Sequence, residues 1–171
     1  MIRWPILLAS SLLASSAGAA TIEELDAATA SIQSVAQDVP LSIETSLLID
    51  AEAQGYGIYT PRASTTYKPK DVIHTYIEPV GVGWRTRDDG ASETDISVDL
   101  HLRTDTGKIA LEQPAMLSLN QVSRLPTDEL GMTLTLNVNK APPGPYVVEY
   151  VLHDRVKNET TTVSSEITIE P

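Results

Sequence analysis

The sequence feature that most constrains the fold is an alternation of apolar and polar residues with a period of two. It recurs from Leu41 to the end of the chain. It is most regular over Thr94–Arg103, where Ile, Val and Leu residues alternate with Asp, Ser, His and Arg. Such a pattern is typical of a half-buried β-strand, because successive side chains of a strand point to opposite faces. We predict main strands over residues 41–50, 72–80, 94–103, 108–113, 132–139, 146–153 and 163–169. Gly, Pro and Asp turns divide them, which favours a mainly β chain folded as an antiparallel β-sandwich.

A single helix is predicted before the first strand, over Thr21–Val39. Thr21 and Glu24 have the spacing of a capping box, and further acidic residues occupy the first turn, where the helix dipole favours negative charge. Its apolar residues recur at spacings of three and four and form one narrow stripe, comprising Ile22, Leu25, Thr29, Ile32 and Ala36. Pro40 ends the helix. Because so weak a stripe makes the helix marginal alone, we expect it to dock on its own domain or on a partner.

Residues 1–20 have the order of a secretory signal peptide. Arg3 gives a positively charged start, Trp4–Leu13 is an almost uninterrupted apolar run, and Ala14–Ala20 holds the small residues that signal peptidase accepts. The apolar run is about half the length that a membrane-spanning helix needs. We therefore predict cleavage at the end of this segment and a soluble product, periplasmic or secreted, with no membrane insertion after cleavage.

The sequence thus predicts three parts, a signal peptide (1–20), a helical N-terminal extension (21–40) and a β-sandwich domain (41–171). The chain contains no Cys, which excludes disulfides, thiol catalysis and zinc–thiolate sites. An exported domain without Cys favours the bacterial periplasm. The chain is acidic, with a formal net charge of −11, and this charge argues against binding to nucleic acid or to anionic lipid.

The last third of the chain carries a set of turn and strand residues, Pro142-Pro143-Gly144-x-Tyr146, Val148, Tyr150, Leu152, Asp154, Lys157 and Ile167-Thr168-Ile169. This pattern resembles the closing hairpin of immunoglobulin-like and fibronectin-III-like modules of bacterial exported proteins. The turn Tyr67-Lys68-Pro69-Lys70-Asp71 is similar to the aromatic-Lys-Pro-Gly-acid turn of many such domains. The resemblance covers residues 41–170 and implies that Tyr146 ties its corner by a hydrogen bond to upstream backbone. It implies an architecture but no function, because this fold carries many functions.

Aromatic and Arg residues in an otherwise acidic chain form a candidate binding surface, Tyr56, Tyr59, Arg62, Trp84, Arg85 and Arg87. These residue types anchor protein interfaces, flat aromatic faces suit sugars, and Arg suits carboxylates. The alternative is structural, because a chain without Phe must use Tyr and Trp in its core.

Other candidate motifs favour structural interpretations. Asp105-Thr106-Gly107 matches the aspartic protease tripeptide, but its charged flanks and its place between two strands predict a hairpin turn. His74, His101 and His153 fall on different strands, with the last two far apart, so we predict no metal site. The acidic segment Asp88–Asp95 lacks the spacing of a calcium loop and is predicted to be a solvated turn. Since no nucleophile–base pair is identifiable, we predict that the chain is not an enzyme and needs no cofactor.

The sequence therefore predicts a non-enzymatic exported protein that acts in protein–protein interaction, with helix 21–39 as the contact to an unknown partner. The alternative is a ligand-binding module for glycan or peptide that uses Tyr56, Tyr59, Arg62 and Trp84.

Overall fold

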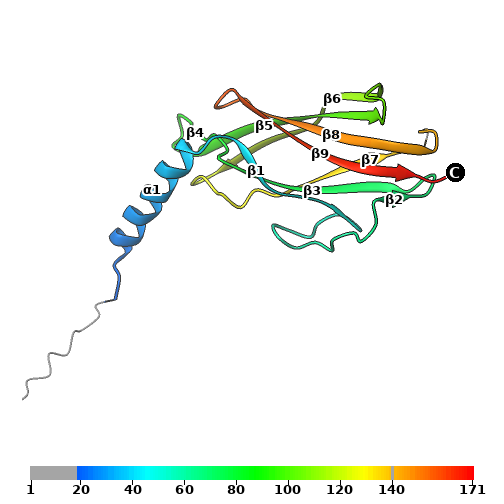
Figure 1. Ribbon diagram of the computed structural model, residues 1–171. Coiled ribbons are helices and arrows are strands. Elements are labelled where there is room, and N and C mark those ends of the chain that lie inside the picture. Colours follow the sequence, from blue (N-terminus) through cyan, green and yellow to red (C-terminus); the bar gives the residue numbers. More distant parts are fainter. Residues whose placement is uncertain (1–18, 140) are drawn as a thin grey trace, which may run out of the picture.

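The computed structural model describes residues 19–139 and 141–171, so the predicted signal peptide falls almost entirely outside the described residues. The prediction of a mainly β chain with one N-terminal helix is confirmed (Figure 1). In chain order the elements are α1 (Ile22–Asp38), β1 (Ser42–Ile49), β2 (Thr66–Tyr67), β3 (Val72–Val80), β4 (Arg85–Thr86), β5 (Ser92–Thr104), β6 (Ile109–Ser123), β7 (Met132–Asn137), β8 (Gly144–Asp154) and β9 (Glu159–Ile169).

The strands form two sheets that share one apolar core. The smaller sheet has the order β1-β3-β7, and the larger has the order β2-β9-β8-β5-β4. In the larger sheet β6 also pairs with β5, along most of its length. Neighbouring strands are antiparallel except β2 and β9, which are parallel. Buried side chains of both sheets meet in the core, among them Ile73, Ile77 and Leu134 of the smaller sheet and Ile96, Val98 and Leu152 of the larger. The alternation in the sequence therefore marks the faces that meet, because alternate residues of β5 and β8 are buried.

Two local turn predictions are also confirmed. The Tyr146 hydroxyl donates a hydrogen bond to the carbonyl oxygen of Pro142 at 2.8 Å, which ties the chain at the start of β8. Residues 104–108 form the hairpin turn between β5 and β6, in which the Thr104 N–H donates to the Lys108 carbonyl at 2.9 Å. Gly107 has a φ of 80°, a conformation that favours glycine.

Two strand boundaries are predicted wrongly by four residues or more, the start of β9, which lies at Glu159 and not at Val163, and the end of β6. The sequence ends the strand after the hairpin at Gln113, but β6 continues past Pro114 to Ser123. Proline is tolerated here because the register shifts opposite Asp99, which indicates a β-bulge, and because β5 is the one strand that β6 pairs with in the described part of the chain.

The helix α1 begins and ends as the sequence predicts. The Glu24 N–H donates to Thr21 Oγ1 at 3.2 Å, and the Thr21 N–H donates to Glu24 Oε2 at 2.8 Å, which completes the capping box. The helix ends at Asp38, just before Pro40, and it projects away from the two sheets (Figure 1). Over residues 19–139 and 141–171, no helix combines the length and the apolar character needed to cross a membrane.

Candidate functional site

The helix α1 exposes its apolar side chains along its length. Their exposed fractions are 75% for Ile22, 64% for Leu25, 62% for Ile32 and 64% for Val35. None of the residues of α1, all of which the structure describes, is buried. Contiguous exposed apolar side chains on an ordered element are typical of an interaction surface, because leaving them in water forgoes their hydrophobic stabilisation.

Lys157 ties the end of α1 to the two-sheet body. Its ammonium Nζ donates hydrogen bonds to the carbonyl oxygens of Val39 and Gly81, each at 2.7 Å. Gly81 has a φ of 70°, and a Cβ at this position would collide with the carbonyl oxygens of Val39 and Pro40. The close approach of the two backbone segments therefore requires glycine at position 81.

Two further hydrogen bonds hold the same junction. The Leu41 N–H donates to Glu159 Oε2 at 2.6 Å, and the Trp84 N–H donates to Gln37 Oε1 at 3.3 Å. The Trp84 side chain is half-buried and packs against the core. Hydrogen bonds at Gln37, Val39 and Leu41 thus attach the C-terminal end of α1 and the chain just after it to the body.

An apolar pocket, here the base pocket, lies where α1 meets the body. Its volume is about 210 Å³, and its lining residues include Ala36, Val39, Val80, Val82, Thr127 and Leu130. Ala36 belongs to the apolar stripe of α1, and Val39 continues the stripe at the next spacing of three. The stripe therefore runs into the base pocket without interruption.

The six residues of the predicted binding surface lie in two separate places. Tyr56, Tyr59 and Arg62 lie in the segment after β1, whereas Trp84, Arg85 and Arg87 follow β3. Since β1 and β3 are antiparallel, the ends of these two strands lie at opposite ends of the smaller sheet. The structure therefore does not bring the six residues together in one site.

Tyr59 anchors the segment 50–65, which folds back onto the smaller sheet. Its ring contacts the ring of Tyr76 on β3, with the centroids 4.5 Å apart. The Tyr76 hydroxyl accepts a hydrogen bond from the Gly57 N–H and donates one to Glu78 Oε1, both at 2.8 Å. Burial, together with the Glu78 carboxylate, raises the pKa of Tyr76 to about 12. Tyr59 therefore has a structural role.

Arg62 holds the other end of the same segment. Its guanidinium carbon lies 4.4 Å from the centroid of the Tyr67 ring, one nitrogen donates to the Thr66 carbonyl at 3.1 Å, and another pairs with Asp50 at 3.6 Å. Tyr56 differs from these neighbours, because 40% of its surface is exposed.

Arg85 and Arg87 make local ion pairs near the start of β5. Arg85 pairs with Glu93 at 3.2 Å, and Arg87 pairs with Asp89 at 3.4 Å across the turn. Both Arg side chains are partly exposed, and ion pairs of this kind contribute little to the free energy of unfolding.

The outer face of the larger sheet pairs His101 and His153 with carboxylates, which the sequence alone does not reveal. His101 Nδ1 lies 2.9 Å from Glu149 Oε1, an oxygen that also accepts a hydrogen bond from Arg103 at 3.0 Å. His153 Nε2 lies 3.0 Å from Asp99 Oδ2. The partners are separated by about 50 residues in sequence, so only the register of β5 against β8 reveals them.

The hydrogen bonds of this face lower the pKa of both carboxyl groups. The Ala115 backbone N–H, and then His153, hold the pKa of Asp99 below its usual range. Hydrogen bonds from His101 and Arg103 lower the pKa of Glu149.

His101 and His153 lie closer together than we predict from their positions on the strands. His101 lies opposite Glu149, four positions from His153 along β8, which corresponds to about 13 Å. Within the described ranges, no group of three or more His, Cys, Asp or Glu residues is arranged to hold a metal ion.

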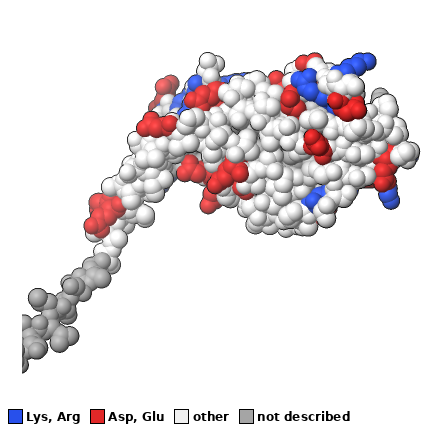
Figure 2. Space-filling model, viewed as in Figure 1, with Lys and Arg blue, Asp and Glu red and all other residues white. Residues whose placement is uncertain are grey.

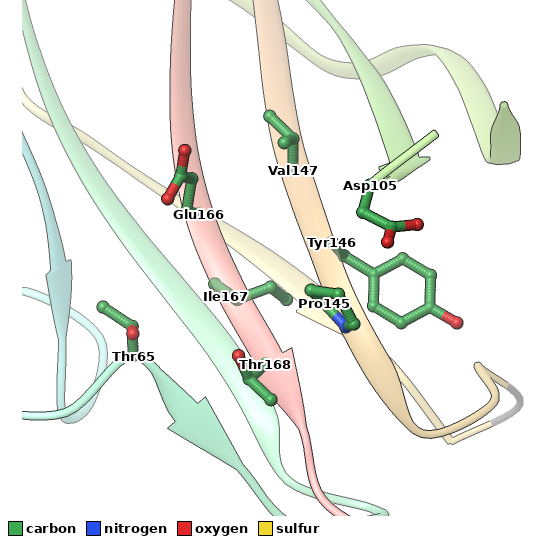
Figure 3. Close-up of a pocket in the computed structure, with 8 residues that line it drawn as sticks. All are labelled: Thr65, Asp105, Pro145, Tyr146, Val147, Glu166, Ile167 and Thr168. Carbon is green, nitrogen blue, oxygen red and sulfur yellow. The ribbon is translucent and has the colours of Figure 1, made fainter. Parts of the chain in front are cut away.

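A larger pocket of about 350 Å³ lies beside the turn between β5 and β6 (Figure 3). Asp105 lies next to the ring of Tyr146 on one side, and Glu166 lies on β9 on the other. Among the described residues that line this pocket, Asp105 is the single Asp. The arrangement therefore does not supply the aspartate pair that protease chemistry requires.

No protein-family model matches the chain, and no curated protein matches its sequence. The functional interpretation of α1 and the base pocket therefore rests on their geometry.

Proposed function

We propose that the chain is an exported, non-enzymatic protein of the bacterial periplasm that binds another protein through α1. The β domain is an immunoglobulin-like sandwich that displays this helix, and residues 1–20 are the signal peptide that is removed on export.

The strand order supports an immunoglobulin-like arrangement of the β domain. One sheet has the order β1-β3-β7, and the other places β9, β8, β5 and β6 side by side. The bond from Tyr146 to the Pro142 carbonyl is the tyrosine corner that the resemblance implies. The parallel pairing of β2 with β9 places the N-terminal part of the domain beside its last strand.

The exposed stripe of α1 is the observation that carries the proposal. Its members Ile22, Leu25 and Ile32 are each more than 60% exposed, although the helix is capped at its start and attached at its end. An isolated helix of this length is marginal in water, so burial against a partner would stabilise it. Full burial of each large side chain contributes about 1.5–3 kcal/mol, enough in sum for a specific contact.

The glycan or peptide alternative receives less support from the observed positions. Tyr59, Arg62 and Trp84 have structural contacts, and Trp84 lies at the opposite end of the smaller sheet from the two tyrosines. A single ligand would have to reach both ends of that sheet.

Affinity capture with matched helix variants tests the proposal. The exported chain, Ile32→Glu and Ser34→Glu are tagged and used to capture proteins from the extracellular or periplasmic extract of the producing cells. Position 32 lies in the stripe, whereas position 34 lies about 200° around the helix. Both variants add one negative charge to an exposed position of α1.

We expect one protein to be captured in stoichiometric amount by the unmodified chain and by Ser34→Glu, but to be lost with Ile32→Glu. Unchanged thermal unfolding of both variants would show that the domain is intact. Equal capture by all three chains, or no captured protein, would contradict the proposal.

A further inference from the structure

Acidic residues lie at both ends of the apolar stripe of α1. Glu23, Glu24 and Asp26 occupy the start of the helix, and Asp38 and Asp128 lie near the base pocket. Residues 27–37 contain no charged side chain, and the helix contains no Lys or Arg. The acidic side chains stand out on the exposed part of the helix in Figure 2. With a rise of 1.5 Å per residue, Asp26 and Asp38 are about 18 Å apart.

The surface between these charges has the spacing that packs against another helix. From Ile22 to Val39 the positions follow each other at intervals of three, four, three, four and three, as in a heptad repeat. From Leu25 onwards larger and smaller side chains alternate, with Leu25 and Ile32 separated by Thr29. Such an alternation leaves hollows into which the side chains of a facing helix can pack.

The base pocket ends this surface with a hollow for one large side chain. Its volume of about 210 Å³ exceeds that of a single aliphatic side chain, and its walls include Val80, Val82 and Leu130. Asp128 also lines it, so a basic residue next to the inserted side chain would meet a carboxylate. Apolar anchors that fill such hollows contribute a large share of the affinity of protein interfaces.

From these features, and on the basis of the proposed function, we infer that the partner presents an amphipathic helix with Lys or Arg residues near both of its ends. The apolar stripe of this helix packs along α1. One of its apolar side chains fills the base pocket, and its basic ends face the acidic groups of α1 and Asp128.

A second copy of this chain does not fit the same surface. Two α1 helices would bring together eight acidic side chains and no basic one, since each contributes Glu23, Glu24, Asp26 and Asp38. This repulsion opposes pairing in either relative direction, whereas a basic partner removes it.

Two synthetic peptides test the charge part of this inference against the full exported chain. Both form an amphipathic helix with an apolar stripe at heptad spacing over about four turns. One carries Lys near both ends, and the other carries Glu at the same positions. We expect fluorescence anisotropy to show at least tenfold tighter binding of the Lys peptide, with an affinity that falls as salt increases.

Two Ala→Met variants test the base pocket. Ala36→Met extends a side chain into the pocket, whereas Ala27→Met makes the same change on the opposite face of α1. We expect Ala36→Met to weaken binding of the Lys peptide at least tenfold and Ala27→Met to leave it unchanged. Equal thermal unfolding temperatures of the variants would exclude a folding defect.

Equal binding of the Lys and Glu peptides would overturn the inferred charge of the partner. Equal binding by Ala36→Met and Ala27→Met would overturn the role of the base pocket. If neither peptide binds, while Ile32→Glu still loses the captured protein, the inference fails and the proposed function stands.

Discussion

The Nζ atom of Lys157 lies 2.7 Å from the carbonyl oxygen of Val39, so the turn after β8 holds the C-terminal end of α1. These two residues are 118 positions apart in sequence. The contact gives a helix without buried residues a fixed origin on the β domain. A helix that is displayed in this way is available to a partner without first having to be released from its own domain.

Replacement of Lys157 by Met should loosen α1 while leaving the β domain folded. The variant loses the hydrogen bonds to Val39 and Gly81, which corresponds to about 1–3 kcal/mol in local stability. We expect faster hydrogen exchange in α1 and unchanged exchange in β5 and β8. Lys68→Met, a change at an exposed lysine, is the control and should leave exchange in α1 unchanged. Equal protection of α1 in both variants would contradict the role of Lys157.

Gly81→Ala should destabilise the chain more than Gly57→Ala. The two glycines have similar positive φ values of 70° and 67°, so both substitutions introduce a similar backbone strain of about 1 kcal/mol. At Gly81 the added Cβ also collides with the backbone of Val39 and Pro40, whereas at Gly57 nothing lies within 4 Å. Urea unfolding should therefore show an additional loss of about 1–3 kcal/mol for Gly81→Ala. Equal losses would mean that the junction can relax.

Tyr76→Phe should release the segment 50–65 from the smaller sheet. The variant removes the hydroxyl that binds the Gly57 N–H and leaves the buried Glu78 carboxylate without that donor, at a cost of about 1–3 kcal/mol. Limited proteolysis should then cut within this segment at least several-fold faster. Tyr56→Phe is the matched control, because Tyr56 is 40% exposed, and its cleavage rate should equal that of the unmodified chain.

The lowered pKa values of Asp99 and Glu149 predict acid sensitivity of the β domain. Because these values lie below those of the unfolded chain, the carboxylates stabilise the fold fully only above about pH 5, where they are ionised in the unfolded chain as well. Their contribution is lost as the pH falls through the folded-state values. The free energy of unfolding, measured by urea titration from pH 6 to pH 2, should therefore fall less steeply in Asp99→Asn and in Glu149→Gln. Slopes identical to that of the unmodified chain would contradict this assignment.

Features that depend on a few neighbouring residues could be predicted from the sequence. The capping box of Thr21 and Glu24, the end of α1 before Pro40 and the Gly107 turn each follow from residues at most four positions apart. The corner bond of Tyr146 is equally local, since its acceptor is Pro142. The strands follow as well, because alternation over five to ten residues already defines a buried face.

Features that depend on strand pairing could not be predicted in this way. One example is the contact of Tyr59 with Tyr76. Others are the pairs of His101 with Glu149 and of His153 with Asp99, which form only in the observed register of β5 and β8. The same limit applies to β6, whose continuation beyond Pro114 depends on its place at the edge of the sheet.

The candidate site was predictable in part. The stripe of α1 follows from its spacing, and so does the expectation that it docks on its own domain or on a partner. The base pocket does not, because Val80, Thr127 and Leu130 come from segments that only the fold brings to Ala36 and Val39.

Site-specific photocrosslinking in the producing cells tests most directly the central claim that α1 is a protein-binding surface. A photoreactive amino acid replaces Leu25 in the stripe or Ala27 on the opposite face of the helix, both of them exposed positions. We expect a crosslink from position 25 to one protein other than the chain itself, and none from position 27. The absence of a crosslink from position 25, or equal crosslinking from both positions, would contradict it.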